Sequence, residues 1–342
     1  MVKKPSLKDI AKKAEVSIAT VSYVLTRGTD SGISPQVSEK IRKIARELNY
    51  RPNQIAQSLQ SGKTYSIGLI VADISNPFFA NIARIIEDEA KRYNYTVIFG
   101  SSDENAKKSA DLLTFLVDRQ VDGFIIAPAE HSEKQLKLLK KEKIPFVLID
   151  RYFPNIESNF VIINNFDSTF NATKKLIDSG HKKIGMVGYD SKLNHMKERI
   201  RGYSEAMENA GSSRLEKNIK TVKFESISEE ISLKIEELLL CEQPVTAILF
   251  ATNTLAIHGM KSIDALKLSV PEDVSVIVFD ASDAFDFYSC PLTYIQQPLL
   301  EIGTRAVNVL IEKIDNPSEN FSKVHLQTKL VLKDSVSIKK PI

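Results

Sequence analysis

The feature that most constrains this chain's fold is a long alternation of apolar runs and amphipathic segments, which begins at Tyr65. The short runs SIGLIVAD, TVIFGS, DGFIIAP and PFVLID alternate with segments whose apolar residues have helical spacing. Such runs are typical of strands buried on both faces, and helices between them favour parallel pairing. The pattern repeats from NFVIIN to VSVIVFD. The sequence therefore predicts an α/β body with two halves, each a doubly wound parallel sheet.

Polar residues lie at the ends of several of these predicted strands. Asp73, Asp150, Thr252 and Asp280 each come at or just after the carboxyl end of a strand. Doubly wound sheets bind their ligands beyond the carboxyl ends of the strands. We therefore expect these four side chains to meet in a cleft between the two halves of the body.

The start of the chain carries two short amphipathic segments that meet at a tight corner. Apolar residues recur at the spacing of one helix face over residues 7–14 and again over 18–25. Only Glu15, Val16 and Ser17 separate the two segments, and the Ser17 hydroxyl can cap the second helix. Two short helices joined in this way are typical of a helix-turn-helix.

Two further helices are predicted before the body begins. Ser34 and Pro35 are a favourable start for a helix over residues 34–48. Residues 53–59 predict a second, shorter helix. Because isolated helices below about 12 to 15 residues are marginal in water, this short helix is expected to order only against a partner.

The charge is uneven along the chain. The first 60 residues contain 11 Lys and Arg against 5 Asp and Glu, a net charge of +6, and the remainder carries −3. Neutralising phosphates supplies much of a protein's affinity for DNA, so a basic head on a weakly acidic body indicates a DNA-binding module joined to a sensor. When charge is considered alone, a solubilising basic surface is the alternative.

Several function classes lack support in the sequence. The two cysteines, Cys241 and Cys290, indicate neither a disulfide framework nor a CxxC metal site, and the histidines show no HExxH spacing. No GxGxxG, GxxxxGK[ST] or GxSxG motif follows a strand, so we expect no catalytic residues, no cofactor and no metal. The apolar runs are far shorter than the roughly 20 residues of a membrane span, and no signal-peptide core follows Met1. A cytoplasmic protein is expected.

A set of motifs in order along the chain resembles the lactose/galactose repressor family. The motifs are KDIAKKAEVSIATVSYVL, RPN, IAQSL, SNPFFANI, VDGFI, SGHKKIG, ERIRGY, FATN and IQQP. The resemblance covers nearly the whole chain. It implies a helix-turn-helix head, a hinge helix and a two-lobed body that resembles periplasmic binding proteins.

The resemblance also implies where the parts begin and end, with three passages of the chain between the lobes. The DNA-binding head would span residues 1–60, including a hinge helix at 53–59, and the effector-binding and dimerisation body would span 64–342. The N-terminal lobe would comprise 64–163 and 292–322, and the C-terminal lobe 164–291 and 323–342.

In such a protein the second helix of the head enters the major groove of double-stranded operator DNA. Ile18 and Ala19 would contact thymine methyl groups or sterically exclude bulkier base edges, whereas Thr20 and Ser22 would hold phosphates. Tyr23 stands where the family often has arginine; the alternative place for this ring is the core of the head. The residues expected at the DNA from this helix are Ser17, Ile18, Ala19, Thr20, Ser22 and Tyr23.

The resemblance assigns a role to the hinge helix as well. Paired hinge helices of a homodimer would insert Leu59 into the minor groove and kink the duplex, with Asn53 and Ala56 also at the DNA. A two-fold protein matches a pseudo-palindromic operator. A leucine packed on the body is the alternative for Leu59.

Between the lobes, the resemblance implies a small-molecule effector, a sugar or sugar derivative. Asp150 and Asp280 would accept hydrogen bonds from its hydroxyls or ring nitrogens, and the guanidinium of Arg199 would grip it. The alternatives are a core position for Phe79 and a surface salt bridge for Arg199. The expected effector-binding residues are Phe78, Phe79, Asp150, Asn164, His195, Arg199, Thr252 and Asp280.

Together these features predict a sequence-specific transcriptional regulator of the repressor type, whose affinity for the operator is controlled by the effector. The alternatives from other classes are a solute-binding protein of a transport system and an α/β enzyme. Both alternatives would leave residues 1–60 without a use.

Overall fold

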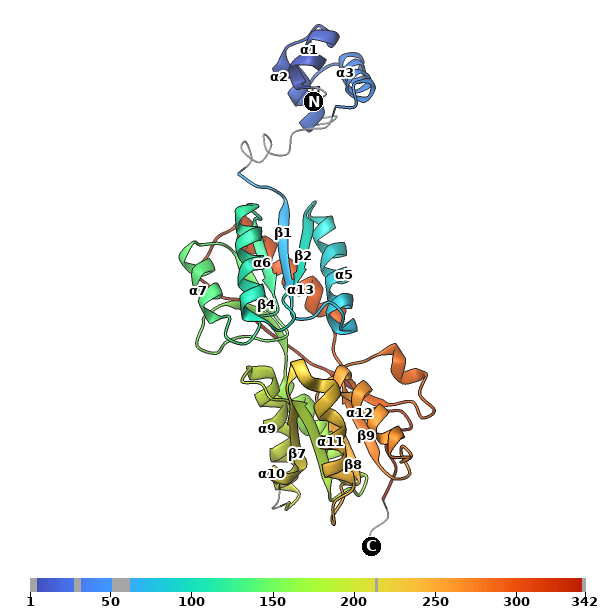
Figure 1. Ribbon diagram of the computed structural model, residues 1–342. Helices are drawn as coiled ribbons and strands as arrows, with labels where there is room; N and C mark the ends of the chain where they lie inside the picture. Colours follow the sequence, from blue (N-terminus) through green and yellow to red (C-terminus); the bar gives the residue numbers. More distant parts are fainter. Residues whose placement is uncertain (1–4, 28–31, 51–61, 213–214, 340–342) are drawn as a thin grey trace. The chain divides into compact units, whose positions relative to one another are not determined.

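The computed structural model describes residues 5–27, 32–50, 62–212 and 215–339 (Figure 1). The chain divides into two compact units, residues 1–64 and 65–342. We refer to them as the head and the body.

The head has a three-helix core of α1 (Leu7–Ala14), α2 (Ile18–Arg27) and α3 (Pro35–Glu47). The turn between α1 and α2 places Glu15 in the left-handed region, with φ at 60°. Ser17 then caps α2, because its Oγ accepts a hydrogen bond from the Thr20 amide at 3.0 Å. Buried side chains from all three helices pack together, among them Ile10, Val21 and Ile41. The predicted helix-turn-helix is confirmed.

The body contains two sheets of six strands each, both built mainly from parallel pairs. The first sheet has the order β11 (Lys323–Leu326), β5 (Asn159–Ile163), β4 (Phe146–Ile149), β3 (Gly123–Ile126), β1 (Ser66–Val71) and β2 (Thr96–Ser101). The second has the order β12 (Lys329–Val331), β10 (Thr293–Gln296), β9 (Ser275–Phe279), β8 (Ala247–Phe250), β6 (Ile184–Tyr189) and β7 (Ile219–Val222). Among the described strands, only β10 and β12 pair antiparallel. The predicted α/β class with two doubly wound sheets is confirmed.

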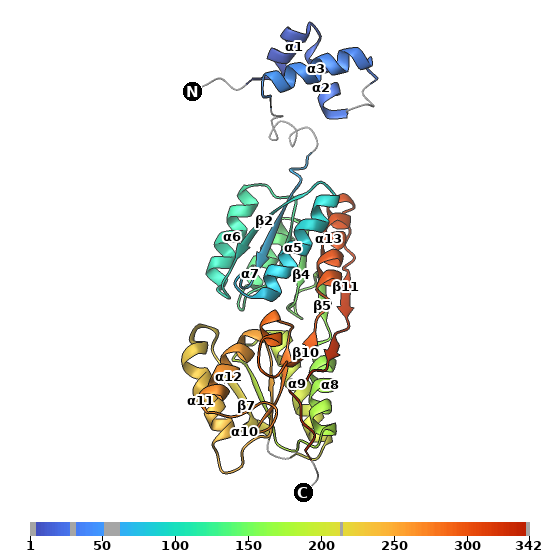
Figure 2. The same cartoon turned by 90° about the vertical axis from the view of Figure 1, so that its right-hand side faces the viewer.

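Helices cover both faces of the first sheet, as its buried strands require. On one face, α6 (Ala106–Asp118) and α7 (Glu133–Lys141) bury leucines against β1, β3 and β4. On the other, α5 (Pro77–Arg92) and α13 (Leu299–Asp315) lie side by side (Figure 2). The first sheet and these helices form the N-terminal lobe.

The C-terminal lobe is built on the second sheet in the same way. Figure 2 shows α8 (Asn165–Asp178) and α9 (Asn194–Asn209) on one face of the sheet, and α11 (Ile227–Leu239) and α12 (Asn253–Ala265) on the other. A short helix, α10 (Leu215–Asn218), leads into β7. The backbones of α8 and α9 approach so closely at Gly202 that a Cβ there would lie 2.4 Å from the carbonyl oxygen of Phe166. This close approach packs the start of α8 against the middle of α9.

The chain passes between the two sheets three times, but two of the predicted boundaries need correction. The N-terminal lobe was expected to resume at residue 292, whereas β10 still pairs with β9 of the second sheet. That lobe was expected to end at 322, whereas β11 pairs with β5 of the first sheet. In both places the chain adds one more strand to the sheet it is in before it crosses, because that strand buries its apolar residues there.

Candidate functional site

A cavity of about 340 Å³ lies between the lobes, at the carboxyl ends of strands from both sheets. Asp73 follows β1 and Asp150 follows β4 in the N-terminal lobe, while Thr252 follows β8 and Asp280 follows β9 in the C-terminal lobe. All four line this cavity. The chain therefore brings together, from both sheets, the four polar strand ends that were expected to meet.

Seven of the eight residues expected at the effector line the cavity. They are Phe78, Phe79, Asp150, His195, Arg199, Thr252 and Asp280. Asn164 is not among the lining residues; its Oδ1 caps α8 by accepting a hydrogen bond from the Asp167 amide at 3.2 Å. The expectation for Asn164 is corrected, since the position serves the start of the helix and the next residue, Asn165, turns toward the cavity arginine.

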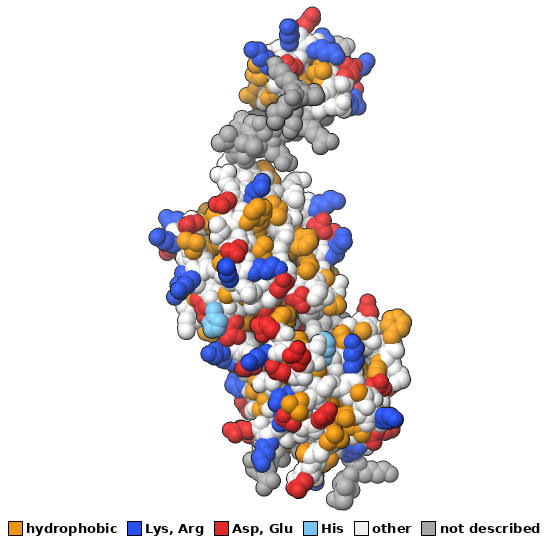
Figure 3. Space-filling model, viewed as in Figure 1, with side chains coloured by type: hydrophobic (Ala, Val, Ile, Leu, Met, Phe, Trp, Pro, Cys, Tyr) orange, Lys and Arg blue, Asp and Glu red, His pale blue; other side chains and the backbone are white. Residues whose placement is uncertain are grey.

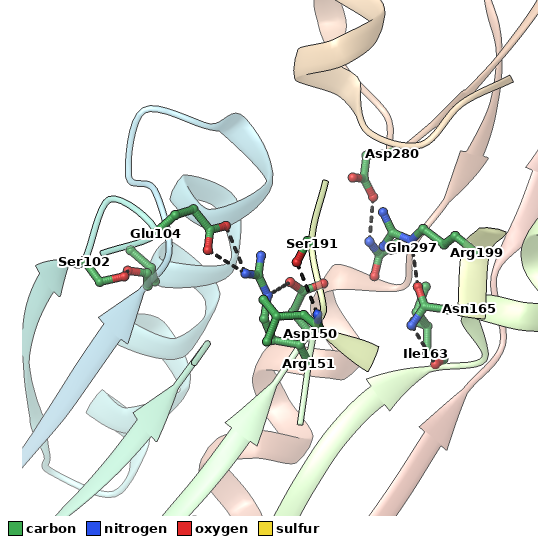
Figure 4. A network of polar contacts seen from close by, with 12 residues as sticks. Ser102, Glu104, Asp150, Arg151, Ile163, Asn165, Ser191, Arg199, Asp280 and Gln297 are labelled. Atoms are coloured by element: carbon green, nitrogen blue, oxygen red, sulfur yellow. Dashed lines mark hydrogen bonds and ion pairs between the residues drawn. The ribbon is translucent and has the colours of Figure 1, made fainter. Parts of the chain in front are cut away.

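Arg199 is held rigidly inside the body. Its Nε donates to Asn165 Oδ1 at 2.8 Å (Figure 4). Its Nη1 donates to the Ala251 carbonyl oxygen at 2.6 Å. The guanidinium carbon lies 3.5 Å from the centre of the Phe279 ring. Burial lowers the pKa of Arg199, while the carboxylates of Asp280 and Asp150 oppose that shift. Because the residue is only 2% exposed, the alternative of a surface salt bridge is wrong.

An ion triplet, in which Asp150 and Arg151 are buried and Glu104 is half-buried, occupies the N-terminal side of the cavity. Arg151 Nε donates to Asp150 Oδ2 at 3.0 Å, and its Nη1 donates to both carboxylate oxygens of Glu104, at 2.9 and 2.8 Å (Figure 4). Burial opposes the charge of Arg151, but the two carboxylates hold its pKa above the ordinary value. Sequence reasoning missed Arg151 and Glu104, although Arg151 directly follows a predicted site residue.

Asp280 faces the triplet from the C-terminal lobe. Its Oδ1 accepts a hydrogen bond of 2.5 Å from Gln297 Nε2, on the segment that crosses between the lobes (Figure 4). Burial raises the pKa of Asp280 to about 6, although the nearby guanidinium of Arg199 acts in the opposite direction. Asp150 and Asp280 both have left-handed backbones, with φ at 66° and 76°, a conformation that aspartate tolerates better than most residues and that ends each strand.

His195 offers the cavity an uncharged imidazole. Its side chain is buried, and its Nδ1 has no hydrogen-bond partner among the described residues. Burial holds the pKa of His195 well below its usual range, and the charges of Arg151 and Arg199 add to this effect. A buried polar atom without a partner is costly, so this nitrogen is suited to a ligand in the cavity.

The apolar part of the cavity comes from the first turn of α5. The rings of Phe78 and Phe79 meet edge to face, with their centres 4.9 Å apart, and both are about nine-tenths buried or more. Both belong to the core of the body and both line the cavity. The two interpretations of Phe79 are therefore compatible.

Carboxylates outnumber cations in the lining. On the face shown in Figure 3, acidic side chains gather where the two lobes meet. The seven lining carboxylates are Asp73, Glu104, Glu130, Asp150, Asp190, Glu225 and Asp280, against Arg151, Arg199 and Lys223. This excess disfavours an anionic ligand and suits a ligand that donates hydrogen bonds.

Direct hydrogen bonds join the lobes at two places beside the cavity. Asn253 Nδ2 donates to Asn76 Oδ1 at 3.0 Å. Just before α7, Glu130 Oε2 accepts hydrogen bonds from Ser191 Oγ at 3.0 Å and from the Lys192 amide at 3.1 Å. Each contact ties a residue just before a helix of the N-terminal lobe to residues at or just before the start of a helix of the C-terminal lobe.

In the head, α2 presents one face to solvent and buries the other. Ser17, Ile18, Ala19 and Tyr23 are exposed, Ile18 and Tyr23 each by 48%, while Thr20 and Ser22 are half-buried. Tyr23 is therefore not part of the head's core, and that alternative is wrong. The hinge residues expected at the DNA, Asn53, Ala56 and Leu59, lie outside the described residues.

Comparison with known proteins identifies the family. Residues 6–53 match the model of bacterial regulatory proteins of the lacI family, and residues 173–336 match the periplasmic binding protein-like domain. The ribose operon repressor of Haemophilus influenzae is 32% identical over 331 residues, which cover 97% of this chain and 98% of that protein. The chain belongs to the lacI family of bacterial regulatory proteins.

Two further members of the lacI family resemble the chain over most of its length. The HTH-type transcriptional repressor PurR of Pasteurella multocida is also 32% identical, with 97% of this chain and 98% of that protein covered. A LacI family transcriptional regulator from Enterococcus faecium, solved with bound ribose, is 27% identical with a TM-score of 0.70, over 80% of this chain and all of that one. No helix in the part of the chain described here is long and apolar enough to cross a membrane.

Proposed function

We propose that this lacI-family protein is a transcriptional repressor, not an enzyme, whose affinity for operator DNA is set by a neutral carbohydrate bound between the lobes. The observation that carries the proposal is the combination, in one chain, of a head with an exposed α2 face and a body with a polar cavity between two lobes. A solute-binding protein or an α/β enzyme would have no use for the head. The protein acts in the cytoplasm as a homodimer.

The exposed face of α2 supports the DNA-binding part of the proposal. Ile18 and Ala19 carry no hydrogen-bonding side-chain groups, so they contact thymine methyls in the major groove. Tyr23 lies one helical turn further on the same exposed face. Asn53, Ala56 and Leu59 of the hinge contact the minor groove, where Leu59 acts as an apolar wedge in a pseudo-palindromic operator.

The chemistry of the cavity favours a sugar. Sugar hydroxyls donate to carboxylates and accept from guanidinium groups, and Asp150, Asp280 and Arg199 provide both kinds of partner. An apolar sugar face packs on Phe78 and Phe79. The ribose operon repressor and PurR are equally identical to this chain, so sequence identity does not choose between their ligands. We take ribose as the first candidate because of the chemistry of the cavity and because one relative was solved with bound ribose.

Titration calorimetry on the full chain tests the ligand. We expect ribose or a related monosaccharide to bind, and its 5-phosphate to bind at least about tenfold more weakly because the carboxylates repel the phosphate. The nucleobase adenine is the competing probe. Preferential binding of the nucleobase, or of the phosphate ester, would contradict the proposed ligand class.

Selection from a random DNA library tests the head. The full chain is expected to enrich a pseudo-palindromic site, and the double variant Ile18→Ala, Tyr23→Ala is expected to lose that preference. Gln36→Ala, an exposed neutral change on α3, is the matched control and should retain it. Enrichment of no common site by the unaltered chain would overturn the DNA-binding proposal.

A further inference from the structure

We propose that the body holds a second ligand site, a groove for a small phosphorylated molecule beside the effector cavity. The groove has a volume of about 920 Å³. It is lined by α7 and the turn before it, by the loop at residues 152–156, and by the start of α9. We call it the lysine groove, after Lys134, Lys137, Lys192 and Lys197, which line it.

The four lysines converge from both lobes. Lys134 and Lys137 lie one turn apart on α7 of the N-terminal lobe, and Lys192 and Lys197 lie before and within the first turns of α9 of the C-terminal lobe. All four are exposed, and in the part of the chain that the structure describes none of them is within ion-pair distance of a carboxylate. Figure 3 shows lysine and arginine side chains along the left flank of the body, where α7 lies above α9 in Figure 1.

The acids of the groove do not cancel this charge. Only Glu130 and Glu133 line it. Glu130 is already engaged, since its carboxylate accepts the hydrogen bonds from Ser191 and the Lys192 amide. The lysine groove therefore has an excess of positive charge, opposite in sign to the effector cavity, so the two sites select ligands of different charge.

The start of α9 also lines the groove, through Leu193 and Asn194. Leu193, the residue that precedes α9, offers no capping side chain, and the first turn of the helix contains no acidic residue. Backbone N–H groups of a first turn have no partner within the helix and carry part of the helix dipole. With Lys192 and Lys197 beside them, they suit an anion with several acceptor oxygens, such as a phosphate.

The remaining wall of the groove suits the organic part of a ligand. Tyr152 and Phe153 line it and are half-buried, and the Tyr152 ring stacks on Phe160 with the ring centres 4.6 Å apart. A fixed aromatic wall next to four cations favours a phosphate ester with an apolar or aromatic body over free phosphate. The aromatic wall would contact the organic part of a specific ligand, whereas an unspecific counterion would not use it.

A ligand in the lysine groove contacts both lobes at once. It joins Lys134 and Lys137 to Lys192 and Lys197, beside the hydrogen bonds that already tie Glu130 to Ser191 and Lys192. Such a ligand stabilises the lobe arrangement in which these groups are close. By linkage, it strengthens binding of any effector that needs the same arrangement, and the effector strengthens its binding by an equal factor.

Titration of the full chain with phenyl phosphate, inorganic phosphate and sulfate at constant ionic strength tests the site. We expect phenyl phosphate to bind most tightly and sulfate to bind least. The double variant Lys134→Gln, Lys192→Gln should weaken phenyl phosphate binding by about tenfold or more. The matched control Lys141→Gln, Lys182→Gln removes two exposed lysines outside the groove and should leave binding within about twofold.

Three outcomes would overturn the proposal. One is the absence of binding of phenyl phosphate at millimolar concentration, and another is an equal loss in the groove variant and the control, which indicates general charge attraction. The third is displacement of phenyl phosphate by the sugar that fills the effector cavity, which would place the ester in that cavity. Simultaneous binding of phenyl phosphate and sugar would support the second site. Failure of every sugar to bind would contradict the proposed function and leave the lysine groove proposal standing.

Discussion

Asp280 is a buried carboxyl whose ionisation opposes folding. Burial raises its pKa from the ordinary 3.8 to about 6, so between these values the folded chain keeps a proton that the unfolded chain releases. The free energy of unfolding of the natural protein should therefore fall, relative to that of Asp280→Asn, by about 1–3 kcal/mol as pH rises from about 4 to 6. Denaturant unfolding of both proteins at pH 4, 5 and 7 measures this difference, and a difference independent of pH would contradict the assignment.

Arg199 combines a ligand-facing position with a structural one. Replacing it with lysine removes the planar donors to Asn165 Oδ1 and the Ala251 carbonyl oxygen. We expect Arg199→Lys to lower stability by about 1–3 kcal/mol and sugar affinity by about tenfold or more. Arg201→Lys, a change at an exposed arginine on the same helix, is the control. Calorimetry and thermal unfolding should separate the two variants; equal behaviour would show that Arg199 has no special role.

The partners of individual side chains were the least predictable part of the site. Asp150 and Asp280 were predictable because each directly follows an apolar run, and the end of such a run marks the carboxyl end of a strand. The sequence does not reveal that Asn165 rather than Asn164 meets Arg199, since this depends on which residue caps α8. Glu104 was missed because a left-handed turn after β2 carries it to the cavity, and the hydrophobic pattern contains no signal for that turn.

At the scale of elements, the head depends on a corner only three residues long. Ser17 supplies the cap of α2 by accepting from the Thr20 amide. We expect Ser17→Ala to destabilise the head by about 0.5–2 kcal/mol and Ser17→Asp to retain most of the stability. Hydrogen exchange of the α2 amides in the full chain without DNA measures the effect, with the amides of β1 as the internal reference. Unchanged exchange in Ser17→Ala would show that the cap is dispensable.

Helices and central strands were predictable because each is marked by the spacing of apolar residues within one continuous segment. The crossings between the lobes were not, because β10 and β11 are short and could extend either sheet. β10 pairs with β9, the strand directly before it in the chain, whereas β11 pairs with β5, a strand far earlier in the sequence. The pairing partner thus determines which lobe each crossing segment joins.

At the scale of the whole molecule, the proposed function requires that sugar binding and DNA binding depend on one lobe arrangement. Three hydrogen bonds beside the cavity join the lobes: Asn253 to Asn76, and Ser191 and Lys192 to Glu130. A motion that opens the cavity would break them. Sugar contacts from both lobes favour the arrangement seen here. The coupling between sugar and operator is expected to be about 1–3 kcal/mol, and it must be reciprocal.

Loosening one tie should therefore reduce this coupling more than it changes DNA binding itself. Glu130→Ala removes the acceptor of two hydrogen bonds between the lobes, whereas Glu133→Ala removes a nearby carboxylate that accepts no such bond from the described residues of the other lobe. We expect Glu130→Ala to bind sugar several-fold more weakly, to bind operator without sugar nearly as the natural protein does, and to show a smaller sugar effect on operator affinity. The measurement is operator affinity with and without saturating sugar for the three proteins. Equal coupling in all of them would mean that these contacts do not belong to the arrangement that links the two sites.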